Sequence, residues 1–329
     1  SKSDSVQASS AGIKVIEPSA VKAAVVVGSK AVSASTPPAD GQTSASQVVG
    51  GSWARPKGPS PNDDVVLEQW KAEGKLFVLE GVWCAVPYKV TMTLEAAAPD
   101  PDAARSKGQT VVDAVAAEAE KIFSHFVENS EVSAINRLGA DVLHEPSAPM
   151  RKVLAMAERL NQLTRGLFDP AVLPLERFYK ARAASGDLSG VEEVAAYSKW
   201  SMFKLTAEGV LKQKDTAQLD LCGLAKGWAI DEMSAKLKEA GFSSSYIDWG
   251  GDIKVSGQHP VGRNWTAAVV EPPSIEEIGS KKENQQFLAH LELRDGQSIA
   301  TSGDYMQMLS AGRSHIIDPK TSGPVLISG

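Results

Sequence analysis

Residues 219–231 read LDLCGLAKGWAID, and this stretch decides how we interpret the chain. A short apolar run meets small residues at Cys222 and Gly223, and a helical pattern then continues until Gly241. Small side chains let a ligand approach the backbone, and a helix N-terminus offers free N–H groups to an anion. Lys226 in the first turn opposes the helix dipole, which favours a phosphate between this lysine and the helix end. The alternative is a tight strand-to-helix turn with a solvated lysine.

Further segments dense in turn-forming and hydrogen-bonding residues lie on both sides of this stretch. One holds an aspartate stiffened by the proline that follows it, and another places two carboxylates around a flexible Gly-Gly pair. The segments are residues 126–136 (FVENSEVSAIN), 166–175 (GLFDPAVLPL), 248–253 (DWGGDI), 300–305 (ATSGDY) and 314–324 (SHIIDPKTSGP).

In this order the segments resemble the FAD:protein FMN transferase family, also called the ApbE family. A single such string arises easily by chance, whereas six in series do not. The resemblance covers roughly residues 77–329, and residues 81–88 and 248–252 are most similar to the flavin-transferase-like domain fused to fumarate reductases of some protists. It implies an α+β, T-fold-related domain of mixed sheets flanked by helices. No GxGxxG turn or regular βαβ rhythm is present, so we do not expect a Rossmann fold.

The resemblance also implies an activity and a set of ligands. Members of that family use Mg²⁺ to cleave the pyrophosphate of FAD, join FMN to a Thr or Ser of an acceptor protein and release AMP. Such phosphoryl transfer depends on positioning and charge neutralisation. By similarity, the carbonyl of Gly223 would be a metal ligand. The residues implied to contact FAD are Phe126, Ser130, Glu131, Leu167, Phe168, Asp169, Asp220, Lys226, Asp252, Thr301 and Ile317.

His315 is the residue that we expect to deprotonate the acceptor hydroxyl, because imidazole titrates nearest neutrality. The alternative is a structural histidine that stabilises its turn through an interaction with Asp318. Asp252 and Asp304 have a similar alternative as turn-forming carboxylates that hydrogen-bond their own backbone.

Several positions depart from the family pattern. Phe126 stands where a tyrosine is usual, Cys222 replaces a glycine, and Cys84 occupies the place of a methionine. The family's later segment, with an Asp and a Thr that complete the Mg²⁺ site, is not found within residues 1–329, so we expect these residues alone to leave the metal site incomplete. Two hypotheses therefore stay open. One is an active transferase whose metal site is completed by residues beyond 329, and the other is a non-catalytic flavin-binding or structural subunit of a larger, organellar assembly.

Composition narrows the class of protein. The 329 residues are 43% hydrophobic and 22% charged, which is ordinary for a globular domain. A net charge of −6 argues against a general nucleic-acid binder, since no excess of basic residues is available for phosphates. No apolar stretch approaches the ~20 residues that span a bilayer. The two cysteines lie in different contexts, so we expect neither a disulfide framework nor a zinc site of recognisable spacing.

Residues 1–62 differ in kind from residues 63–329, which we expect to form the flavin-transferase-like domain. Residues 1–62 are rich in Ser, Ala, Val, Gly and Pro. Such a segment cannot bury enough apolar area to offset the conformational entropy that it would lose on becoming ordered. They are either a disordered tail, with a targeting remnant included, or a segment that docks on a partner through the apolar residues 21–27. This leader and the protist-like resemblance favour an organelle, a mitochondrion or plastid.

Overall fold

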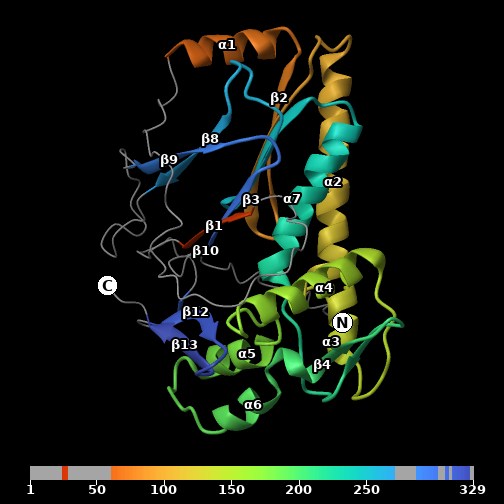
Figure 1. Cartoon of the computed structure of the whole chain (residues 1–329), viewed down its shortest axis with the longest axis vertical. Coiled ribbons are helices and arrows are strands. Elements are labelled where there is room, and N and C mark those ends of the chain that lie inside the picture. Colours follow the sequence, from red (N-terminus) through yellow and green to blue (C-terminus); the bar gives the residue numbers. More distant parts are fainter. Residues whose placement is uncertain (1–23, 29–60, 271–286, 303–307, 311–312, 327–329) are drawn as a thin grey trace, which may run out of the picture.

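The computed structural model describes residues 24–28, 61–270, 287–302, 308–310 and 313–326. In these ranges the chain forms helices packed against β-sheets, which confirms the predicted α+β class (Figure 1). No helix within these ranges is long and apolar enough to cross a lipid bilayer.

A six-stranded sheet occupies the centre of the domain, with strand order β1-β10-β7-β6-β3-β2. Every neighbouring pair is antiparallel. Side chains alternate between the two faces of a strand, and in β6 this places Ile247 and Trp249 in the core and leaves Asp248 half-buried. The strands are β1 (Ala24–Gly28), β2 (Leu76–Trp83), β3 (Val86–Thr93), β6 (Ser244–Trp249), β7 (Asp252–Ser256) and β10 (Ser298–Ser302).

Two long helices, α2 (Pro101–Phe123) and α7 (Cys222–Glu239), pack against each other and against this sheet (Figure 1). Asp100 caps α2 by accepting a hydrogen bond from the Ala103 N–H. The first helical residue is Pro101, whose ring fixes φ at a value that suits a helix. Helix α2 ends at Phe123 because the backbone becomes extended at Ser124. Phe126 is thereby released from the helix and lies in the loop that follows it.

The remaining elements pack around these two helices and the sheet, and β8 and β9 share a hydrophobic cluster with β7 and β10. The sheet β11-β12-β13 packs against α5. The helices are α1 (Pro61–Ala72), α3 (Glu131–Arg137), α4 (Ala148–Leu163), α5 (Leu173–Arg182) and α6 (Val191–Tyr197). The strands are β4 (Phe203–Leu205), β5 (Val210–Lys212), β8 (Trp265–Val270), β9 (Phe287–Leu293), β11 (Met308–Ser310), β12 (Arg313–Asp318) and β13 (Gly323–Leu326).

The N-terminal segment contributes two elements. The helix α1 begins at Pro61, two residues before the expected start of the domain. Within the expected tail, β1 pairs antiparallel with β10 at the edge of the central sheet. Part of the apolar segment 21–27 therefore lies on this chain's own sheet, while residues 21–23 fall outside the described ranges.

A buried polar network fixes the segment that leads into α7. The Asn136 Nδ2 donates to the Leu219 carbonyl at 2.9 Å, and its Oδ1 accepts from the Leu219 N–H at 2.7 Å. Beside it, the Lys212 Nζ donates to the Asn136 carbonyl at 2.7 Å. Lys212 is only 1% exposed, and burial lowers its pKa below the ordinary value. Its charge is solvated by main-chain carbonyls in place of water, the others being those of Asp215 and Ala217.

We expect Asn136→Ala to lower the free energy of unfolding by about 2–4 kcal/mol, because it leaves both main-chain groups of Leu219 unpaired in the interior. Urea unfolding followed by circular dichroism measures this change. The control is Asn129→Ala at an exposed position in the preceding loop, for which we expect almost no change. Equal losses in the two variants would contradict the role of the amide.

Candidate functional site

The N-terminus of α7 lies at the centre of the candidate site. Its N-cap, Leu221, offers no side-chain hydrogen bond. The N–H groups of residues 224 and 225 donate to the Leu221 carbonyl, each at 2.9 Å, and the Cys222 N–H donates to Asp220 Oδ1 at 2.8 Å. Among the described residues, the Gly223 N–H is the group of this turn that is left without an acceptor. The predicted set of free N–H groups thus reduces to one that can receive an anion.

The same geometry bears on the predicted metal ligand at Gly223. Carbonyls inside an α-helix point toward its C-terminus and accept from the N–H four residues later. Gly223 is the second residue of α7, so its carbonyl is oriented along the helix. The ring of Phe168 comes within 3.6 Å of the position that a Cβ at residue 223 would take. Metal binding by this carbonyl stays a prediction.

His125, Asp220 and Cys222 form a tight cluster beside this helix end. The His125 Nδ1 is 3.4 Å from Asp220 Oδ1 and 3.8 Å from Cys222 Sγ. Burial alone would raise the pKa of Asp220, but hydrogen bonds from His125 and Cys222 outweigh it and hold this pKa below its ordinary value. Burial, reinforced by the charge of Asp220, raises the pKa of the Cys222 thiol.

Lys226 and Asp252 form an ion pair, with Nζ 3.0 Å from Oδ2. Asp252 opens β7 directly after the turn Gly250–Gly251, where both glycines have positive φ, 60° and 88°. A Cβ at Gly250 would also lie 2.3 Å from a methyl group of Val86. Lys226 therefore has a carboxylate partner in this structure, where the sequence favoured a phosphate.

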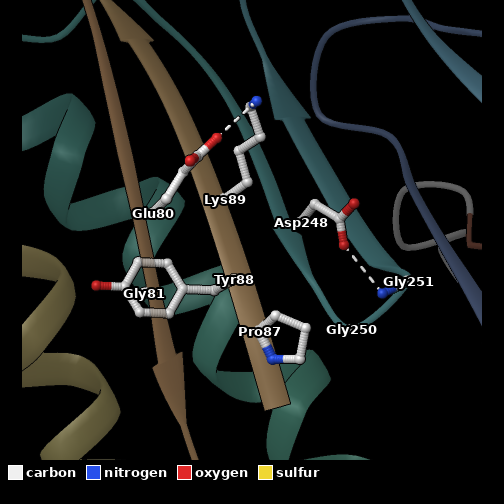
Figure 2. Close-up of a pocket in the computed structure, with 8 residues that line it drawn as sticks. All are labelled: Glu80, Gly81, Pro87, Tyr88, Lys89, Asp248, Gly250 and Gly251. Carbon is white, nitrogen blue, oxygen red and sulfur yellow. Dashed lines mark hydrogen bonds and ion pairs between the residues drawn. The ribbon is translucent and has the colours of Figure 1, made fainter.

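A shallow hollow of about 410 Å³ lies on the other side of this turn, between β2, β3 and β6 (Figure 2). Figure 2 shows the Tyr88 ring across Gly81, its partner in the β2–β3 register. Asp248 accepts a hydrogen bond from the Gly251 N–H at 2.9 Å, which ties the turn to the rim of the hollow. The turn thus lines the hollow through Gly250 and Gly251, and the residue that follows it, Asp252, holds Lys226.

The predicted residues of segment 126–136 divide into an exposed ring and two structural anchors. Phe126 is 76% exposed, and its ring centroid is 4.0 Å from that of His125. Ser130 caps α3 by accepting from the Ser133 N–H. Glu131 accepts from the Ser147 N–H at 2.7 Å and from its hydroxyl at 2.5 Å. Ligand contact by Ser130 and Glu131 stays a prediction, because their side chains already hold α3 and α4 in place.

The turn at residues 167–169 lies against the entry to α7, because the Asp220 N–H donates to the Pro170 carbonyl at 2.7 Å. Leu167 is 58% exposed, whereas Phe168 faces Gly223. Asp169 accepts from the N–H groups of Ala171 and Trp200. Burial raises the pKa of Asp169, and these two hydrogen bonds oppose the shift. The aspartate stabilises the turn that carries Phe168.

The C-terminal predicted residues lie on two other strands. Thr301 is on β10, opposite Val25 of β1. His315 is half-buried on β12. Ile317, on the same strand, packs with Phe178 and Tyr179 of α5. Asp304 lies outside the described residues.

The structure therefore brings together Asp220, Gly223, Lys226, Phe168 and Asp252, from three separate segments. Sequence reasoning missed His125, whose contact with Cys222 spans 97 residues and leaves no local pattern. The one feature of the sequence that could have indicated His125 is that it directly precedes Phe126, a predicted site residue.

Comparison with known proteins gives a consistent result. Residues 86–328 match the model of the ApbE family. The chain is 30% identical over 255 residues to the FAD:protein FMN transferase of Chlamydia trachomatis, with 75% of this chain and 74% of that protein covered. It is 31% identical over 225 residues to the protein of the same name from Vibrio cholerae, covering 66% and 65%.

Solved structures are similar in fold. The apo form of the flavinyl transferase ApbE of Pseudomonas stutzeri superposes with a TM-score of 0.62 at 23% identity, over 76% of this chain and 75% of that chain. The flavin transferase ApbE of Vibrio cholerae gives 0.62 at 24% identity, over 76% and 78%. The predicted flavin-transferase fold is confirmed, and with a family match that spans most of its length this chain belongs to the ApbE family.

Proposed function

We propose that this chain is a flavin transferase, which takes FAD as substrate, transfers its FMN half to a Thr or Ser hydroxyl of an acceptor protein and releases AMP. Membership of the ApbE family and the name shared by its relatives support this proposal. The observation in the structure that carries it is the N-terminus of α7, where the unpaired Gly223 N–H and the Lys226 ammonium occupy the same turn.

This helix end suits the pyrophosphate of FAD. The positive end of the helix dipole and the Gly223 N–H attract a phosphate oxygen. An ammonium has three N–H donors, so the ion pair with Asp252 leaves Lys226 two donors for phosphate oxygens. Asp252 in turn orients the lysine, because it anchors Nζ at 3.0 Å.

Aromatic groups around the same helix suit the ring systems of FAD. Phe126 presents an exposed face for stacking. The indole Nε1 atoms of Trp228 and Trp249 have no hydrogen-bond partner among the described residues, but they are buried, so a ligand reaches them only if neighbouring side chains move. The site as it stands therefore fits a ligand that is both anionic and aromatic.

In the proposed reaction, the acceptor hydroxyl oxygen attacks the phosphorus of the FMN half. The new P–O bond forms as the bond to the bridging pyrophosphate oxygen breaks, and AMP leaves with that oxygen. The hydroxyl proton passes to His315, the proposed base. Lys226 and the Gly223 N–H neutralise charge that develops on the phosphate oxygens.

Magnesium dependence is part of the proposal through the family resemblance alone. Within the described ranges, the group of three side chains that could ligate a metal ion is His125, Asp220 and Cys222. It includes a nitrogen and a sulfur donor, whereas Mg²⁺ prefers six oxygen ligands. This donor set does not fit magnesium, and no step above passes through it.

A non-catalytic flavin-binding subunit is the second candidate function. It is favoured by the donor set of His125, Asp220 and Cys222, which does not fit the Mg²⁺ that transfer in this family uses. The two functions share the FAD site and differ in whether a covalent bond to flavin forms.

Flavin labelling separates the two functions. The whole chain is incubated with FAD, Mg²⁺ and a Thr-containing acceptor peptide, and in-gel flavin fluorescence that survives denaturation is measured. We expect labelling by the wild type, a loss of at least about 100-fold in His315→Ala, and wild-type labelling in His290→Ala on β9. No labelling by a wild type that still binds FAD would establish the binding-only function, and equal labelling by both histidine variants would remove His315 from the mechanism.

Binding of FAD tests the helix end separately. We expect Lys226→Met to raise the Kd for FAD by about 10- to 100-fold, because a charge-assisted hydrogen bond contributes about 1.5–3 kcal/mol. Quenching of flavin fluorescence measures the Kd. The matched control is Lys236→Met near the other end of α7, where the lysine pairs with Glu118. An unchanged Kd in Lys226→Met would show that FAD binds elsewhere.

Labelling in the presence of EDTA tests the metal requirement. The family resemblance implies Mg²⁺-dependent transfer, so we expect EDTA to abolish transfer to the peptide and excess Mg²⁺ to restore it. Full labelling in EDTA would show that the reaction proceeds without a chelatable metal.

A further inference from the structure

The cluster of His125, Asp220 and Cys222 brings three different metal-ligating atoms together from distant parts of the chain. The ligand atoms all lie within 4.8 Å of one another. His125 comes from the loop after α2, and the other two residues come from the entry to α7. Imidazole nitrogen, carboxylate oxygen and thiolate sulfur are the three donor types that proteins use for zinc.

Two of the three distances between ligand atoms match those around a tetrahedral ion. With metal–nitrogen and metal–oxygen bonds near 2.0–2.1 Å and a metal–sulfur bond near 2.3 Å, tetrahedral angles separate N from O by about 3.3 Å and N from S by about 3.6 Å. The corresponding distances here are 3.4 Å and 3.8 Å. The third pair, the carboxylate oxygen and the sulfur, lies within 4.8 Å.

The arrangement differs from a nucleophilic triad of cysteine, histidine and aspartate. In such a triad the imidazole lies between its partners and uses a different ring nitrogen for each. Here the carboxylate and the sulfur both approach Nδ1 of His125. Convergence on one atom cannot relay a proton through the ring, but it is the geometry that surrounds a shared ion.

The surroundings hold the ligands in place. The Cys222 N–H donates to Asp220 Oδ1, which fixes the carboxylate relative to the thiol. The ring of Phe126 lies over His125, whose side chain is only 6% exposed. The three ligand atoms are therefore positioned by their neighbours in the protein itself.

We propose that His125, Asp220 and Cys222 bind one divalent transition-metal ion of the zinc class, through Nδ1, a carboxylate oxygen and Sγ. On binding, the Sγ proton is released to solvent and the sulfur becomes a metal thiolate. Three protein ligands leave a fourth tetrahedral position for water or another oxygen ligand. The nitrogen and sulfur donors select against Mg²⁺ and Ca²⁺. This inference does not rest on flavin transfer, and its test needs no FAD.

Cobalt titration of the whole chain tests the site, because a Co²⁺–thiolate bond gives a charge-transfer band in the near ultraviolet. We expect the band to saturate at one Co²⁺ per chain. We expect Zn²⁺ to abolish it, since zinc binds such sites more tightly than cobalt. Excess Mg²⁺ should leave it unchanged. A wild-type protein without the band, or one whose band Mg²⁺ removes, would overturn the proposal.

The chain supplies its own control, because its second cysteine, Cys84, is exposed and belongs to another contact, with Glu120. We expect Cys222→Ser to abolish the band and Cys84→Ser to retain it. We expect His125→Gln and Asp220→Asn to weaken Co²⁺ binding by more than about 100-fold, beyond the cost of losing an outer partner. Far-ultraviolet circular dichroism of each variant shows that it is folded. A band lost in Cys84→Ser but kept in Cys222→Ser would place the metal elsewhere.

Discussion

The amide of Asn136 is the contact on which the rest of the site depends. Its two hydrogen bonds satisfy both the N–H and the carbonyl of Leu219, a fully buried residue. A neighbouring β-strand would form the same pair of hydrogen bonds. A main-chain segment that crosses the interior outside any sheet otherwise has no partner for these groups. Lys212 completes the arrangement by holding the carbonyl of Asn136 itself. The interior of this domain is therefore organised around a polar network as well as a hydrophobic core.

Fixing Leu219 also fixes the residues of the candidate site that follow it in the sequence. The next residue, Asp220, receives the Cys222 N–H and lies against His125. The same segment is hydrogen-bonded to the turn of Phe168 through the Pro170 carbonyl. Helix α7 begins two residues after Asp220, so these hydrogen bonds also fix the orientation of its N-terminus. Positioning of this kind is what phosphoryl transfer requires of a protein, since the chemistry needs few covalent steps.

The sequence predicted those parts of the molecule that local patterns determine. The helix from Cys222 to Glu239 and its end at Gly241, with φ of 96°, follow from spacing and from the one residue that adopts such a backbone easily. The charge partner of Lys226 could not be predicted, because a lysine near a helix end attracts a phosphate and a carboxylate alike.

Other features escaped prediction because they are set by tertiary contacts. His125 and Cys222 meet only after α2 and α7 have packed. The carboxylate of Glu131 accepts hydrogen bonds from the N-cap residue of α4, 16 residues further on. Phe126 lies three residues beyond the end of α2, and its ring is exposed. Neither feature follows from the pattern of its own segment.

The strand β1 has a consequence that concerns solubility rather than chemistry. Without it, β10 would be the edge of the central sheet, with a row of main-chain donors and acceptors open to any extended chain. Five residues of the N-terminal segment occupy that row in antiparallel register. The segment thus acts as a built-in guard against edge-to-edge association between copies of the domain, a role that its low-complexity composition does not suggest.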